Sequence, residues 1–359
     1  MNATRQLHEL GQSLWLDNIT RALLDSGTLA RYIRELSVTG LTSNPTIFDQ
    51  AIRNSSDYDA AIREKARTDV SDEALFFELA IADLSRAAAL FLPVHQDSSG
   101  VDGWVSLEVS PLLAHDAAGT VASALALHRQ AACPNLYIKI PGTPEGLIAI
   151  EECIFAGVPV NVTLLFSCAQ TLAAAEAYLR GIERRVAAGL DAHVQSVASL
   201  FISRWDVAVK DKLPSELSNR LGIAVAQQTY HRAQALYSSA RWLKLSVAGA
   251  LPQQLLWAST GVKDAGLRDT AYVEALAAPR TINTMPEKTL LAFADHGHLG
   301  APMNPDDDAA ARLAQFSAAG IDIDALALRL QQEGAQSFEK SWHELIGCIH
   351  RKRAELLPA

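Results

Sequence analysis

Short apolar runs alternate with longer stretches of helical periodicity along the chain. Eight of these runs end at a polar or turn-forming residue, which is typical of strands that stop at the edge of a sheet. They occupy residues 13–16, 38–43, 101–109, 136–140, 159–164, 197–202, 254–259 and 280–284. The pattern therefore predicts eight short strands.

Helical periodicity fills most of the sequence between these strands. It follows an N-terminal helix or arm in residues 1–12 and covers residues 22–35, 47–94, 120–131, 144–155, 169–188, 221–251 and 306–357. Alternating strands and helices predict βα units and a parallel sheet. Eight such units in 359 residues indicate an α/β protein with one (β/α)8 TIM barrel domain and additional helices, including a C-terminal helical extension from about residue 303 to 359. The structural alternative is a doubly wound sheet, but its usual G-x-G-x-x-G motif is missing.

Composition narrows the class of protein. With 49% apolar and 20% charged residues, the chain can bury a large core. The net charge of −9 argues against general nucleic-acid binding, which needs a basic face, and no apolar run is long enough to span a bilayer. The four cysteines lack a disulfide-framework or zinc-site spacing and no signal peptide is visible, so we expect a cytoplasmic protein.

The fourth predicted strand carries a lysine among apolar residues. Lys139 lies between Ile138 and Ile140, and lysine is rarely buried without a partner. Burial lowers the pKa of an amine, and the free amine is the nucleophile that forms a Schiff base with a carbonyl substrate. The alternatives are an exposed lysine on an edge strand, or one whose stem packs while its ammonium group reaches water.

Polar residues gather at or near the C-terminal ends of the predicted strands. In a barrel this rim is where catalytic residues lie, and polar groups there are costly unless they pair or act. They are Asp17, Asn44, Glu108, Lys139, Asn161, Thr163, Ser199, Arg204 and Ser259. Structural alternatives exist for most of them: a helix cap for Asp17, a turn for Asn44, an ion pair with a structural lysine for Glu108, a hydrogen-bonded core pair for Asn161 and Thr163, and a surface ion pair for Arg204.

Three stretches of the sequence match a known family in order and spacing. Residues 40–48 (GLTSNPTIF) resemble the first transaldolase signature, and residues 136–146 (LYIKIPGTPEG) resemble the second, around the Schiff-base lysine. Residues 161–167 (NVTLLFS) are similar to the stretch after the fifth strand. Residues 257–263 (WASTGVK) and 283–286 (NTMP) resemble the longer bacterial transaldolases.

The resemblance implies a role for each residue of the reacting centre. The family fold is a (β/α)8 barrel of the class I aldolase kind. By resemblance, Lys139 attacks the ketose carbonyl, Glu108 moves protons through a water held with Thr163, and Asp17 removes the proton of the sugar C4 hydroxyl.

The resemblance also implies a set of substrate-binding residues. Two asparagines match those that bind the hydroxyl groups of the three-carbon fragment, and four residues match the wall and the phosphate site. These residues are Asn44, Asn161, Ser199, Phe201, Arg204 and Ser259. The short transaldolases carry an arginine two residues after the position of Ser259, where this chain has Gly261, and Lys263 is the candidate replacement.

The resemblance implies a transferase of the pentose phosphate pathway. It moves a dihydroxyacetone unit from sedoheptulose 7-phosphate or fructose 6-phosphate to glyceraldehyde 3-phosphate or erythrose 4-phosphate. We expect no cofactor and no metal; His296 and His298 lack a carboxylate at ligand spacing. The expected partners are sugar phosphates rather than nucleic acid or membrane, and a homo-oligomer is left open.

Two alternatives to this function are a lysine aldolase that releases the fragment and a barrel that binds sugar phosphates without turnover. The C-terminal segment either covers the barrel mouth or forms a dimer contact.

Overall fold

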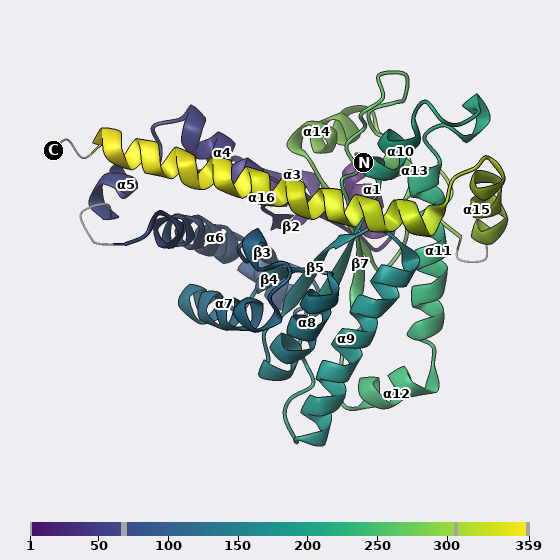
Figure 1. The fold of residues 1–359 in the computed structure, drawn as a ribbon, viewed down its shortest axis with the longest axis horizontal. Coiled ribbons are helices and arrows are strands. Elements are labelled where there is room, and N and C mark those ends of the chain that lie inside the picture. The colour runs from purple at the N-terminus through teal and green to yellow at the C-terminus, as the bar shows by residue number, and fades with distance from the viewer. Residues whose placement is uncertain (1, 66–69, 305–307, 357–359) are drawn as a thin grey trace.

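The computed structural model describes residues 2–65, 70–304 and 308–356. Parts of the predicted N-terminal arm, of the helical stretch 47–94 and of the C-terminal extension lie outside these residues. The described chain forms eight parallel strands around which the helices are arranged (Figure 1). The strands are β1 (Gln12–Asp17), β2 (Val38–Thr42), β3 (Val105–Glu108), β4 (Leu136–Pro141), β5 (Val160–Leu165), β6 (Ser196–Phe201), β7 (Gln254–Ala258) and β8 (Thr281–Met285).

One helix precedes β1, and helices follow each of the strands. They are α1 (Ala3–Glu9), α2 (Arg21–Asp25), α3 (Thr28–Leu36), α4 (Pro45–Asn54), α5 (Asp59–Lys65), α6 (Asp72–Asp97), α7 (Ala117–Ala131), α8 (Pro144–Ala156), α9 (Cys168–Ala187), α10 (Ser203–Val209), α11 (Leu221–Leu236), α12 (Ala240–Val247), α13 (Ala271–Ala275), α14 (Glu287–His296), α15 (Ala309–Ala318) and α16 (Ile323–Leu356), with 3-10 turns η1 (Pro111–Leu113) and η2 (Ser215–Leu217). The strand order β2-β1-β8-β7-β6-β5-β4-β3 confirms the predicted TIM barrel and excludes the doubly wound sheet.

All eight predicted strands are confirmed, but the third begins later than predicted. Residues 101–103 form a loop instead, because the Ser98 hydroxyl binds the backbone N–H and carbonyl of Asp102 and occupies groups that a strand would pair. Several predicted helices are divided. The stretch 22–35 breaks at Gly27, whose φ of +72° does not fit a right-handed helix.

The predicted helices 221–251 and 306–357 are also divided, because a new helix cap lies within each of them. Ser239 accepts the N–H of Trp242 and starts α12, and Asp322 accepts the N–H of Ala325 at the start of α16. Helices α10, α13 and α14 were not predicted: α10 and α14 begin two residues after β6 and β8 end, and α13 has only five residues.

The barrel closes where β2 meets β3. A single parallel bridge joins Gly40 to Trp104, and the Leu41 N–H donates to the Trp104 carbonyl at 3.0 Å. A Cβ atom on residue 40 would lie 2.6 Å from the Trp15 indole and 2.7 Å from the Trp104 carbonyl oxygen. Only glycine permits this close approach, so Gly40 is required by the closure.

An aromatic layer fills the barrel below the strand ends. Trp104 stacks on Tyr137 with ring centroids 4.1 Å apart, and Trp15 lies 6.1 Å from Tyr137. Residues two apart on a strand share a face, so Lys139 points into the barrel directly above Tyr137. The rings provide an apolar floor for the lysine.

Asp102 stabilises the contact that closes the barrel and lies below the aromatic layer. Its carboxylate accepts hydrogen bonds from the Trp15 indole at 2.9 Å, from the Gly103 amide at 3.0 Å and from the Ser13 hydroxyl. Burial raises the pKa of Asp102, while the bonds from Ser13 and Trp15 oppose that rise. The loop before β3 is thereby bound to β1.

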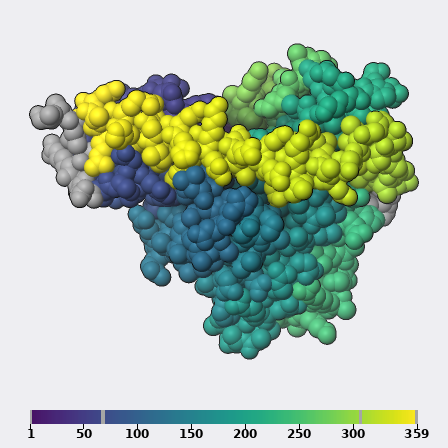
Figure 2. All heavy atoms as spheres, viewed as in Figure 1, coloured from purple at the N-terminus to yellow at the C-terminus, as the bar shows by residue number. Residues whose placement is uncertain are grey.

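The C-terminal helix α16 lies along the C-terminal ends of β4 and β5. The side-chain amide of Gln331 donates to the carbonyls of Gly142 at 3.0 Å and Leu164 at 2.9 Å. The helix continues from there to α4, α5 and α6, and it forms a band across the molecule (Figure 2). Of the two alternatives for this segment, the structure confirms that it covers the barrel mouth.

We predict that Asp102→Ala lowers the free energy of unfolding by about 3 kcal/mol, because it leaves the buried Trp15 N–H without an acceptor. Asp102→Asn keeps an acceptor and removes a buried charge, so it should lower the free energy of unfolding by less than about 1 kcal/mol. Urea unfolding curves measure both. An equal loss in the two variants would contradict this account of the closure.

Candidate active site

A cavity of about 150 Å³ opens at the C-terminal ends of the strands, under α16. Nine of the eleven predicted site residues line it: Asp17, Asn44, Lys139, Thr163, Ser199, Phe201, Arg204, Ser259 and Lys263. Glu108 and Asn161 lie beside it on β3 and β5 and do not line it. The barrel therefore gathers residues from 17 to 263 at one rim.

Glu108, Lys139 and Asn161 are register partners across three neighbouring strands. The Lys139 Nζ lies 3.6 Å from a Glu108 carboxylate oxygen and donates to the Ser43 carbonyl at 3.2 Å. Both residues are 6% exposed, so the exposed-edge alternative for Lys139 is wrong. The ion-pair alternative for Glu108 involves a structural lysine. Glu108 does pair with a lysine, but this lysine lines the cavity.

Several polar atoms at and near this pair lack hydrogen-bond partners among the described residues. Among the described residues, neither Glu108 oxygen accepts a hydrogen bond, and the buried Thr163 hydroxyl also has no partner. Burial raises the pKa of Glu108, whereas the charge of Lys139 opposes this rise. A carboxyl with a raised pKa beside an amine can take up a proton and release it again.

Asp17 stands at the end of β1 on the same rim. Thr42 donates to its carboxylate at 2.7 Å, and the Thr42 and Thr284 hydroxyls are 2.7 Å apart. Burial raises the pKa of Asp17, while Lys139 and the Thr42 hydrogen bond oppose the rise. The cap of α2 is Thr20, so the capping alternative for Asp17 is wrong.

The two asparagines differ in their surroundings. Asn44 caps α4 by accepting the Ile47 N–H at 3.1 Å, and its side chain also lines the cavity. Asn161 is fully buried, donates to Ser106 at 3.1 Å and accepts from Ser199 at 2.7 Å. It thus belongs to a hydrogen-bonded core group, although with other partners than Thr163.

Two further cationic side chains, those of Arg204 and Lys263, line the cavity. Arg204 is the second residue of α10, which follows β6; its guanidinium lies 5.7 Å from the centroid of the Phe201 ring and makes no hydrogen bond or ion pair with a described residue. The surface ion-pair alternative is therefore wrong. Burial lowers the pKa of Arg204. Lys263 lines the same cavity, and Ser259 holds a left-handed backbone (φ +58°) with its hydroxyl 3.0 Å from that of Ser203.

Sequence reasoning missed two contributors to the site. Thr42 lies inside the first motif but was given no role. Phe338 of α16 lines the cavity, with its ring centroid 5.8 Å from the Lys139 Nζ. A phenylalanine in an amphipathic helix is usually a core residue, so nothing in the sequence indicated that it would reach a lysine in β4.

The histidines considered for metal have other partners. His296 pairs with Asp269 at 2.9 Å and Asp295 at 3.1 Å on an exposed surface. In the described parts of the chain, no group of three or more His, Cys, Asp or Glu side chains could hold a metal ion. None of the described helices is both long and apolar enough to cross a bilayer.

Comparison with known proteins agrees with the motifs. Residues 14–349 match the family described as Transaldolase/Fructose-6-phosphate aldolase. A transaldolase of Thiobacillus denitrificans is 44% identical over 97% of this chain and 100% of its own length. Transaldolases of Neisseria gonorrhoeae and of an Arthrobacter species are each 43% identical, over 96% of this chain and 99% and 96% of their own lengths.

We predict that Thr42→Val moves the acidic limb of the pH–kcat profile to higher pH. Loss of the hydrogen bond disfavours the carboxylate form and raises the pKa of Asp17, so the protonated, inactive form persists to higher pH. Thr42→Ser keeps the hydroxyl and should retain the original limb. A Thr42→Val profile with a lower kcat but an unshifted acidic limb would contradict the assignment of this limb to Asp17.

Proposed function

The chain belongs to the transaldolase/fructose-6-phosphate aldolase family, and we propose that it acts as a transaldolase of the pentose phosphate pathway. It would transfer a dihydroxyacetone unit from sedoheptulose 7-phosphate or fructose 6-phosphate to glyceraldehyde 3-phosphate or erythrose 4-phosphate. The observation that carries this proposal is the buried Lys139 amine, 3.6 Å from Glu108, in a cavity that also holds Asp17 and Arg204.

The first half of the reaction builds the Schiff base. The Lys139 amine attacks the ketose carbonyl carbon and gives a carbinolamine, which must lose its hydroxyl as water. Glu108 supplies the proton, through a water that it shares with Thr163, and the product is an iminium ion. The open hydrogen-bonding capacity of Glu108 and Thr163 supports this relay. The raised pKa of Glu108 suits it to donating a proton.

Asp17 then triggers cleavage of the carbon–carbon bond. Its carboxylate takes the proton of the C4 hydroxyl, the C3–C4 electron pair moves into the iminium, and an aldose phosphate leaves. The three-carbon fragment remains on Lys139 as an enamine. Attack of the enamine on an acceptor aldehyde, with return of the proton from Asp17, reverses these steps, and hydrolysis frees the product. Asn44 and Asn161 would hold the hydroxyls of the fragment; Asn44 is in the cavity, whereas Asn161 would act from below it through Ser199.

The substrate phosphate fits the cationic end of the cavity. Arg204 offers a guanidinium fork that lies over the Phe201 ring and forms no hydrogen bond with a described residue, and such a fork matches phosphate oxygens. Lys263 adds a second cation where the short transaldolases use an arginine. Ser259 and Ser199 line the wall between the phosphate end and the reacting centre, together with Phe201.

The cover over Lys139 favours transfer over release. A transferase must keep water from the enamine until an acceptor aldehyde arrives. Phe338 places an apolar ring near the lysine, and Gln331 fixes its helix to the ends of β4 and β5. This shielding, and the transaldolase names of the relatives, favour transfer over the aldolase alternative. Binding without turnover does not explain a buried lysine with two carboxylates. Location in the cytoplasm and a homo-oligomeric state stay predictions.

The proposal is tested by following both fates of the fragment. With fructose 6-phosphate and erythrose 4-phosphate, we expect sedoheptulose 7-phosphate to form about 100-fold faster than free dihydroxyacetone. Phe338→Ala should raise the fraction of the three-carbon fragment that is released as dihydroxyacetone about tenfold. Phe338→Leu keeps an apolar cover and should raise this fraction much less. Release as the main reaction of the unaltered protein would favour the aldolase.

We predict that Lys263→Met raises KM for fructose 6-phosphate about tenfold, because it removes a contact to the phosphate. The charge of Lys263 also lowers the pKa of Asp17, so the acidic limb of the profile should move to higher pH while kcat above that limb stays nearly unchanged. Steady-state kinetics measure this effect. Lys244→Met, an exposed lysine on α12, is the matched control and should change neither constant. If the two variants behave alike, Lys263 is not the second phosphate cation.

A further inference from the structure

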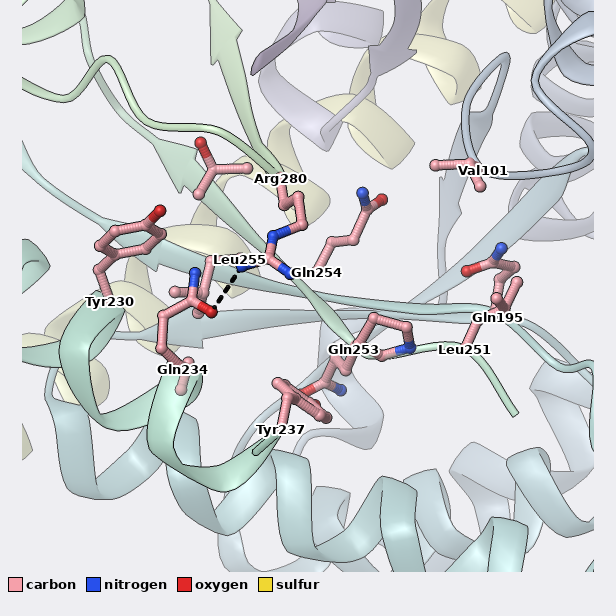
Figure 3. Close-up of a pocket in the computed structure, with 13 residues that line it drawn as sticks. Val101, Gln195, Tyr230, Gln234, Tyr237, Leu251, Gln253, Gln254, Leu255 and Arg280 are labelled. Atoms are coloured by element: carbon pink, nitrogen blue, oxygen red, sulfur yellow. Dashed lines mark hydrogen bonds between the residues drawn. The ribbon is translucent and has the colours of Figure 1, made fainter. Parts of the chain in front are cut away.

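A second cavity lies at the N-terminal ends of the strands, away from the end that carries the transfer site. Figure 3 shows the residues that line it. Its volume is about 250 Å³. Gln195 directly precedes β6, Gln254 begins β7 and Thr281 begins β8, so the cavity sits where these strands enter the barrel. The last two turns of α11 form its other wall. None of the residues assigned to the transfer reaction lines it.

The walls of this cavity are mostly apolar. Leu251, Leu255, Ala233 and Tyr230 are among the residues that line it. Burial raises the pKa of Tyr237 well above its usual range, so its hydroxyl stays neutral. Such walls suit a ring or another compact apolar body.

One cation enters this apolar space. The exposed Arg280 directly precedes β8 and lines the cavity, and its guanidinium donates to the Gln234 side-chain oxygen at 3.0 Å (Figure 3). Among the described residues, no carboxylate lines the cavity or forms an ion pair with Arg280. The positive charge is therefore not neutralised by the protein.

Glutamine amides and hydroxyl groups provide the remaining polar groups, and the buried Tyr237 hydroxyl has no hydrogen-bond partner among the described residues. Gln195 and Gln253 already donate, to the Gly100 carbonyl and to the Ser196 hydroxyl. The side-chain oxygen of Gln254 is buried and has no partner among the described residues. A buried acceptor without a donor is costly, so this oxygen indicates a ligand that carries a donor.

We propose that this cavity binds a small aromatic monocarboxylate that carries a ring hydroxyl. The volume holds one ring, since a cavity of about 150 Å³ already accommodates benzene. The carboxylate pairs with the planar Arg280 fork, and the hydroxyl supplies the donor for Gln254. A sugar phosphate fits poorly, because a dianion with many hydroxyls would meet one cation and apolar walls.

The test uses 4-hydroxybenzoate as the probe and calorimetric titration of the full chain. We expect a dissociation constant of about 1 mM or tighter, unchanged when fructose 6-phosphate is saturating. Arg280→Gln should weaken binding at least about tenfold, because it removes the charge, and it should leave the transfer rate unaltered. The neutral isostere 4-hydroxybenzyl alcohol should bind the unaltered protein as weakly as the carboxylate binds the variant.

Control variants separate this site from other binding. Arg129→Gln removes an exposed arginine from α7 and should bind the probe like the unaltered protein. Ala233→Phe fills the cavity and should abolish binding while the transfer rate shows that the protein is folded. Three results would overturn the proposal: no heat of binding, equal affinity in the Arg280→Gln variant, or displacement of the probe by fructose 6-phosphate. Each of these is independent of whether the transfer reaction proceeds.

Discussion

The placement of an ionisable lysine inside the barrel is the constraint on which the rest of the structure depends. Removing charges from water costs several kcal/mol per ion unless they are paired. Lys139 meets this cost by lying beside Glu108, within the field of Asp17, and by donating to the Ser43 carbonyl. The same burial that makes the arrangement costly raises the pKa values of both carboxyls, and this suits them to exchange protons with a substrate.

Two features of the fold maintain that environment. Beneath the lysine, the rings of Trp15, Trp104 and Tyr137 exclude water from the barrel interior, and Gly40 lets the barrel close around them. Above it, α16 places Phe338 over the amine. The lysine is therefore enclosed from below by the barrel and from above by a helix that lies far away in the sequence. A transfer reaction needs this enclosure more than an aldolase does, because its enamine must wait for a second substrate.

The strands and most of the site could be predicted because each strand is a short apolar run that ends in a polar residue. Parallel strands bring those ends to one rim, so Asp17 and Arg204 could be placed together without knowing any contact. Features that depend on a single tertiary contact could not be predicted. The loop at Asp102 looks apolar and extended until Ser98 and Trp15 are seen to bind it. Phe338 has the spacing of a core residue, and only the course of α16 brings it to the site.

The central claim is that Lys139 carries the three-carbon fragment between the two substrates. It is tested most directly by treating the protein with borohydride in the presence of fructose 6-phosphate and locating the adduct by peptide mass spectrometry. The account predicts a reduced three-carbon adduct on the peptide that contains Lys139, and none in the folded Lys139→Ala variant. An adduct on a different lysine, or no adduct from an unaltered protein that still turns over the sugar, would contradict it.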